Sequence, residues 1–134
     1  MATEKTDYAL RVNLELPYEQ ALEKVTEALK GEGFGVLTRI DVKAILKEKL
    51  GADFRKYVIL GACNPPLAHR ALGTDLDVGL LLPCNVVVYE ENGGSVVAIA
   101  DPMAMLGIIH QPEIENVARE ARAKLKRVIE ALKR

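Results

Sequence analysis

A glycine-rich turn between two apolar segments is the feature that most constrains how this chain can fold. Asn92-Gly93-Gly94 separates residues 86–89 from residues 95–100, and both flanking segments are rich in Val. Asn-Gly and Gly-Gly steps favour the positive backbone φ angles that tight hairpins require. The sequence therefore predicts an antiparallel pair of strands at this place.

Other segments show the periodicities of strands and amphipathic helices. Residues 8–16 alternate apolar and polar side chains, as a half-buried strand does, and residues 34–40 and 57–62 also read as strands. Helices are expected from Pro17 to Gly31, after Asp41 to Leu50, over 65–72 and over 113–133. The pattern predicts one α+β domain over residues 1–134, with two layers: an antiparallel-rich sheet and its long helices on one face.

Composition argues against several classes of partner. The formal net charge is −1 and aromatic residues make up only 4%, which excludes the basic and stacking surfaces typical of nucleic-acid-binding proteins. No apolar segment approaches the roughly 20 residues of a membrane span, so no membrane contact is expected. Residues 1–7 lack the apolar core of a signal peptide, and the expected location is cytoplasmic, where thiols stay reduced.

Two Cys-Asn dipeptides mark the candidate functional site. Cys63-Asn64 and Cys84-Asn85 hold the only cysteines, and each lies where an apolar segment meets a loop. This placement predicts that both thiols lie at one rim of the sheet, with a Cα separation within about 7 Å.

Two interpretations of these thiols stay open. In the first, both cysteines are small hydrophobic residues buried at strand ends, as free cysteine often is. In the second, they form a shared thiol site. In the second case Cys63 precedes the positive end of the helix that begins after Asn64, which would stabilise its thiolate. Disulfide formation, sulfur transfer or binding of a soft metal ion would follow.

The residues around the dipeptides complete the candidate site. Asn64 is predicted to cap the helix over 65–72, with Pro65 at its first position. His69 is expected to be a solvated surface histidine, and it reaches the rim only if this helix folds back over it. The ligand-binding candidates are Cys63, Asn64, Pro65, His69, Pro83, Cys84 and Asn85.

The sequence contains no recognisable catalytic constellation, so the chain is not expected to be an enzyme. Its two histidines, His69 and His110, lack the paired spacing of zinc sites, and no metal is predicted. No cofactor is indicated.

Three blocks of sequence resemble a known family. They are Gly-Phe-Gly-Val-Leu-Thr-Arg-Ile-Asp-Val (33–42), Leu-Gly-Ala-Cys-Asn-Pro (60–65) and Gly-Leu-Leu-Leu-Pro-Cys-Asn-Val-Val-Val (79–88), which are similar to blocks of the family called domain of unknown function 302. The resemblance implies a fold similar to the TATA-binding-protein-like class, β-α-β(4)-α with helical insertions, and a dimer. It implies no settled activity, and sharing a fold class says nothing about binding DNA.

Two functions follow as expectations. The first is a homodimeric module that binds a small-molecule ligand or a partner at the rim of Cys63-Asn64 and Cys84-Asn85. The alternative is a thiol-based redox, sulfur-handling or soft-metal-binding protein that uses Cys63 and Cys84.

Overall fold

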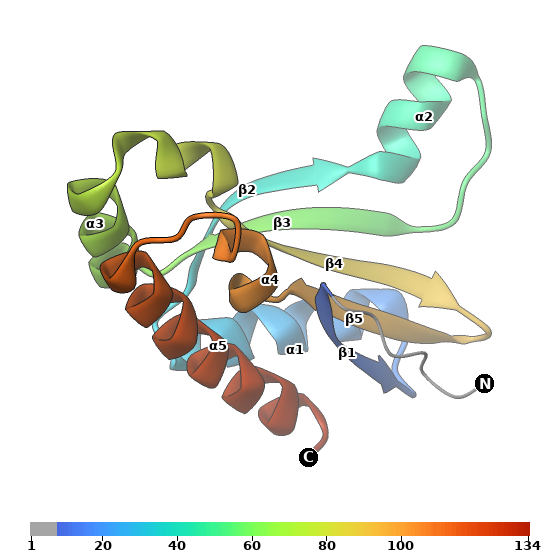
Figure 1. Cartoon of the computed structure of the whole chain (residues 1–134). Coiled ribbons are helices and arrows are strands. Elements are labelled where there is room, and N and C mark those ends of the chain that lie inside the picture. The colour runs from blue at the N-terminus through green and yellow to red at the C-terminus, as the bar shows by residue number, and fades with distance from the viewer. Residues whose placement is uncertain (1–7) are drawn as a thin grey trace.

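The computed structural model describes residues 8–134 as a five-stranded sheet with helices on one face and at one end (Figure 1). The interpretation of residues 1–7 as lacking a signal peptide lies outside this range. The elements in chain order are β1 (Ala9–Leu14), α1 (Tyr18–Gly31), β2 (Gly35–Asp41), α2 (Val42–Leu50), β3 (Tyr57–Cys63), α3 (Pro65–Thr74), the 3-10 helix η1 (Leu76–Leu81), β4 (Cys84–Glu91), β5 (Gly94–Ala100), α4 (Pro102–Leu106) and α5 (Pro112–Leu132).

All neighbouring strands are antiparallel, in the order β1-β5-β4-β3-β2. The predicted α+β class and the predicted hairpin are confirmed: β4 and β5 pair across a turn in which Asn92 and Gly93 have positive φ. Four strands run as a meander, and β1 closes the sheet at the edge beside β5.

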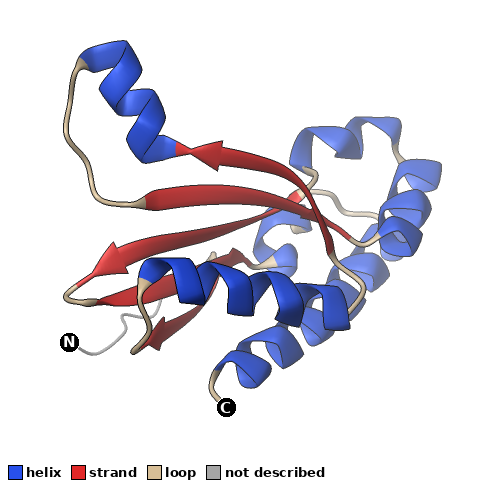
Figure 2. Ribbon diagram, turned by 180° about the vertical axis from the view of Figure 1, so that it is seen from behind, coloured by secondary structure: helices blue, strands red, loops and turns tan. Residues whose placement is uncertain are grey.

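One face of the sheet carries the main core because side chains alternate along each strand. Val12, Val97, Val88 and Val58 lie opposite one another across four strands, and none is more than 7% exposed. Helices α1 and α5 cover this face, as Figure 2 shows from behind, and they contribute Leu22, Val25, Leu29, Leu125, Val128 and Ile129 to the same core. The opposite face, here called the open face, carries the alternate residues of the strands.

A second, smaller core lies at the end of the sheet, where α3, η1, α4 and α5 meet. The helices expected from the sequence do not include residues 76–81 or 102–106. The structure has η1 and α4 there, capped by the side chains of Asp75 and Asp101. These short helices form because Val78 and Leu106 can be buried against α3 and α5.

Helix α2 has a different setting from the other helices. It stands away from the body of the molecule at the end of β2 (Figure 1), and it has no buried residue. Its start and end follow the sequence: the Asp41 side chain accepts a hydrogen bond from the Ala44 amide, and Gly51 ends the helix with a φ of 64°. We call residues 35–56, from β2 through α2 to the start of β3, the arm.

Candidate functional site

A small apolar cavity lies where α3, α4 and α5 meet the ends of β3 and β4. Its volume is about 40 Å³. The helices around it gather at the same end of the sheet in Figure 1. The lining residues are Phe34, Ala62, Cys63, Asn64, Leu67, Ala68, Ala71, Leu82, Pro83, Cys84, Pro102, Leu106, Val117 and Ala121.

Alanine side chains leave the space for this cavity. Ala62 lies on β3, Ala68 and Ala71 lie on the inner side of α3, and Ala121 faces them from α5. Larger side chains at these positions would fill the gap between sheet and helices. Alanine at inner helix positions is the one signal in the sequence that could have indicated the cavity.

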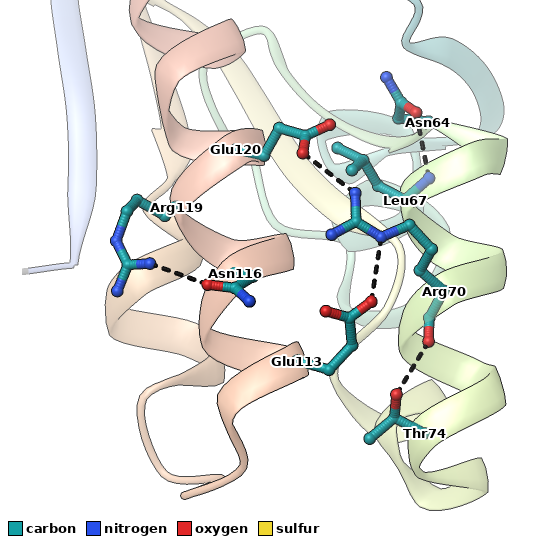
Figure 3. Close-up of polar contacts among 8 residues, drawn as sticks. All are labelled: Asn64, Leu67, Arg70, Thr74, Glu113, Asn116, Arg119 and Glu120. Carbon is teal, nitrogen blue, oxygen red and sulfur yellow. Dashed lines mark hydrogen bonds and ion pairs between the residues drawn. The ribbon is translucent and has the colours of Figure 1, made fainter.

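Asn64 fixes the position of α3 beside the cavity. Its side-chain oxygen accepts a hydrogen bond of 3.3 Å from the Leu67 amide (Figure 3), which confirms the predicted N-cap. Its Nδ2 donates a hydrogen bond of 3.3 Å to the Glu32 carbonyl. Asn64 is only 9% exposed. The oxygen and the nitrogen of its side-chain amide each have a hydrogen-bond partner, and the bond to Glu32 joins α3 to the loop between α1 and β2.

An ion-pair cluster holds α3 against α5 outside the cavity. The Arg70 guanidinium donates through Nε to Glu113 at 3.3 Å and through Nη1 to Glu120 at 3.0 Å (Figure 3). The two glutamates are about two turns apart on α5, so one arginine from α3 spans them. These hydrogen bonds, first with Glu120 and then with Glu113, raise the pKa of Arg70.

The structure brings four of the seven predicted site residues to this cavity. Cys63, Asn64, Pro83 and Cys84 line it. Pro65 is exposed at the first position of α3, His69 is exposed on the same helix, and Asn85 is exposed on β4. These three residues lie outside the cavity lining. His69 occupies the solvated surface position that was expected for it.

The prediction that the two thiols are close together is wrong. Cys84 pairs with Ala62 across β3 and β4, and Cys63 is the next residue along β3. Successive side chains of a strand point to opposite faces, so the Cys63 side chain points to the other face of the sheet from Ala62 and its partner Cys84. The two thiols are therefore not close, although both residues border the cavity at the end of the sheet. Both are free cysteines. A disulfide or a two-sulfur metal site between them therefore has no geometric basis.

Burial makes Cys84 a poor nucleophile. Its side chain packs against the main core, and this burial, followed by the charge of Cys63, raises the pKa of the Cys84 thiol to about 11. The thiolate is the reactive form of cysteine, and at neutral pH Cys84 stays protonated. Among residues 8–134, no group of three His, Cys, Asp or Glu side chains is arranged to hold a metal ion.

Aromatic and arginine side chains gather on the open face of the sheet. The rings of Tyr57 and Tyr89 stack with their centroids 5.3 Å apart, and Arg11 Nη2 donates a hydrogen bond of 2.8 Å to the Tyr89 hydroxyl. The ring centroids of Phe54 and Tyr57 are 6.1 Å apart, and the Arg55 guanidinium carbon lies 5.9 Å from the centroid of the Tyr89 ring. Within the described residues, Arg11 Nε is buried without a hydrogen-bond partner.

Comparisons with known proteins agree with this fold. The family model described as "Domain of unknown function DUF302" matches residues 10–132. A solved structure, the crystal structure of an uncharacterized conserved DUF302 protein from Bacillus stearothermophilus, is 36% identical with a TM-score of 0.83, covering 96% of this chain and 98% of that one. No curated protein matches the chain. No helix within residues 8–134 is both long and apolar enough to cross a membrane. With the family model spanning β1 to α5, the chain belongs to the DUF302 family.

Proposed function

We propose that this protein is a homodimeric binding module whose small-molecule ligand occupies the cavity bordered by Cys63, Asn64, Pro83 and Cys84. The observation that carries the ligand site is the cavity itself, because residues from both Cys-Asn blocks line it together. Concave apolar sites with a few polar groups are the usual form of small-molecule sites. The binding role does not depend on a reactive thiol, which agrees with the raised pKa of Cys84.

The proposed dimer is supported by the arm. Leu37 and Leu50 are 68% and 74% exposed, and Ile40, Ile45 and Phe54 are each more than 40% exposed. Within its own chain, α2 buries none of its residues. Phe54 connects this apolar surface to the aromatic cluster of the open face. Tyrosine and arginine are enriched among the residues that contribute most to interfaces.

A second copy is the occupant that fits this surface. A two-fold contact brings the same surface of each copy together, so one apolar arm covers another. Sedimentation at tens of micromolar should then show a species of twice the 14.7 kDa chain mass. Leu50→Glu should shift the sedimenting species towards the monomer, whereas Leu76→Glu, at a position 83% exposed on η1, should not. A wild-type protein that sediments only as the 14.7 kDa chain would contradict the dimer.

The ligand site is tested separately by methyl NMR. A library of small polar, charged and apolar compounds is screened for shifts in the methyl signals of Ala68, Ala71 and Ala121. We expect at least one compound to shift the methyl signals of Ala71 and Ala121 in the wild type. The same signals should not shift in Ala68→Leu, in which a larger side chain fills the cavity. A library without any such compound would contradict the ligand-binding role.

A further inference from the structure

The lining of the cavity points to the class of ligand: we propose that it takes an unbranched alkyl group, either a small neutral molecule or the end of a longer chain. This inference rests on the proposed ligand-binding role of the same cavity.

The walls offer almost nothing to a polar or charged ligand. Eleven of the lining residues are Ala, Leu, Val, Phe or Pro, and none of the fourteen carries a charge. The remaining three are Cys63, Cys84 and Asn64. A carboxylate, phosphate or ammonium group placed here would lose its water without gaining an ion-pair partner.

Asn64 is the strongest polar group of the lining, and both its oxygen and its nitrogen already have a partner within the protein, which leaves one N–H and one oxygen lone pair. Its oxygen accepts from the Leu67 amide and its Nδ2 donates to the Glu32 carbonyl. Turning the amide toward a ligand would break the N-cap of α3. The two thiols are weak hydrogen-bonding groups, and Cys84 stays protonated at neutral pH. Methylene groups need no hydrogen bond and are therefore favoured.

The cavity has a floor and a mouth. Leu67, Ala71, Val117 and Ala121 are buried and form the floor, whereas Cys63, Ala68, Leu82 and Pro83 are half-buried and lie nearer the surface. A chain can thus enter with one end while the rest of the molecule stays outside. The partly exposed mouth accommodates a polar group at the outer end of that chain.

The size of the cavity favours a chain over a ring. An engineered apolar cavity of about 150 Å³ binds benzene, and the volume here is about 40 Å³. A benzene ring would have to displace the walls, which are held by the main core on one side and by the Arg70 ion pairs on the other. A volume of about 40 Å³ holds roughly one or two carbon atoms, because one water molecule already takes up about 30 Å³ of liquid, so only the end of a narrow chain enters without displacing the walls.

A homologous series tests the class. The wild-type protein is titrated with the n-alcohols from methanol to hexanol, with the matching n-carboxylates and with benzene, and the methyl signals of Ala71 and Ala121 are followed. Because each buried methylene contributes a similar free energy, the dissociation constant should fall about fourfold per added carbon until the chain outgrows the cavity. Binding should be lost in Ala68→Leu and kept in Ala123→Leu, whose position on α5 is exposed.

The carboxylates distinguish the two sources of the alkyl group. Equal binding of hexanol and hexanoate assigns the site to the end of a longer chain with its polar group outside. Binding of alcohols alone assigns it to a neutral small molecule.

Three outcomes would overturn the alkyl class: no shift with any alcohol or carboxylate, binding that Ala68→Leu leaves unchanged, or benzene binding more tightly than hexanol. If polar compounds of the library shift the same methyl signals while alkyl probes do not, only the ligand class is wrong. If neither set shifts them, the proposed ligand-binding role is wrong as well.

Discussion

At the scale of single residues, Asn64 links the cavity to the stability of the fold. Asn64→Ala removes the hydrogen bond that caps α3 and should lower the free energy of unfolding by about 1 kcal/mol. Asn64→Ser keeps a hydroxyl oxygen for the cap but loses the donor to the Glu32 carbonyl, so its loss should be smaller. Urea unfolding measures both. Equal losses in the two variants would show that the cap contributes nothing.

Gly61 is a residue at which neighbouring side chains leave no room for a Cβ. A Cβ there would lie 2.2 Å from Thr38 Oγ1 and 2.8 Å from Pro83 Cγ. The Thr38 hydroxyl can rotate away, but the proline ring cannot. Gly61→Ala should therefore cost about 1–3 kcal/mol in urea unfolding, and adding Thr38→Ala should recover only part of it. Full recovery would mean that Pro83 moves freely.

The buried Cys84 thiol should make stability fall in alkaline solution. Its pKa is raised from 9.0 to about 11 in the folded protein. Between these values the unfolded chain loses the thiol proton while the folded protein keeps it, so a rising pH favours unfolding. Below pH 9 both states are protonated and the effect is absent.

The size of this alkaline effect follows from the two pKa values. A difference of about two pKa units corresponds to roughly 2–3 kcal/mol lost by about pH 11. Unfolding measured from pH 8 to 11 in the wild type and in Cys84→Ala isolates this part, because tyrosine and lysine titration is common to both. Parallel pH profiles would show that Cys84 titrates normally.

At the scale of elements, α3 and α5 are joined by charges at their surface and by the second core beneath. Arg70→Met removes both ion pairs with Glu113 and Glu120 and should lower the melting temperature. The difference from wild type should shrink in 1 M salt, because exposed ion pairs are screened. Arg119→Met is the matched control, because Arg119 is exposed and donates a hydrogen bond to Asn116 of its own helix (Figure 3). An undiminished difference at high salt would assign the effect to packing of the arginine stem.

The same elements show which features could be predicted from the sequence. The starts of α2 and α3 depend on local capping by Asp41 and Asn64, and both were predicted correctly. All five strands were predicted: the first from alternation, which follows from burial of one face, and the last two from the turn at Asn92 and Gly93. Helices η1 and α4 were missed, since short helices need the contacts of Val78 and Leu106 with distant segments.

The candidate site could be predicted only in part, for a related reason. The position of Cys63 and Cys84 at neighbouring strand ends follows from the chain, but their faces depend on the register between β3 and β4. A shift of one residue decides whether two side chains meet or diverge. The cavity depends on three helices that come together only in the folded molecule.

At the scale of the whole molecule, the proposed dimer should make stability depend on protein concentration. If folded chains associate through the arm, dilution favours unfolding by mass action. The melting temperature of the wild type should rise between 1 and 100 μM, and that of Leu50→Glu should stay constant. A wild-type melting temperature that does not change with protein concentration would contradict the proposed dimer.

The strand order also sets the sequence of events during synthesis. β1 is the first strand to be synthesised. It lies at the edge of the described sheet, and its neighbour there is β5, the last strand to be synthesised. Leu14 pairs with Ser95, and Ala9 with Ala100, so some eighty to ninety residues separate the partners. Strands β2 to β5 can pair with their neighbours in turn as they leave the ribosome. Val12 and Leu14 must instead wait, with their apolar side chains unpaired, until the hairpin at Asn92 and Gly93 has been translated.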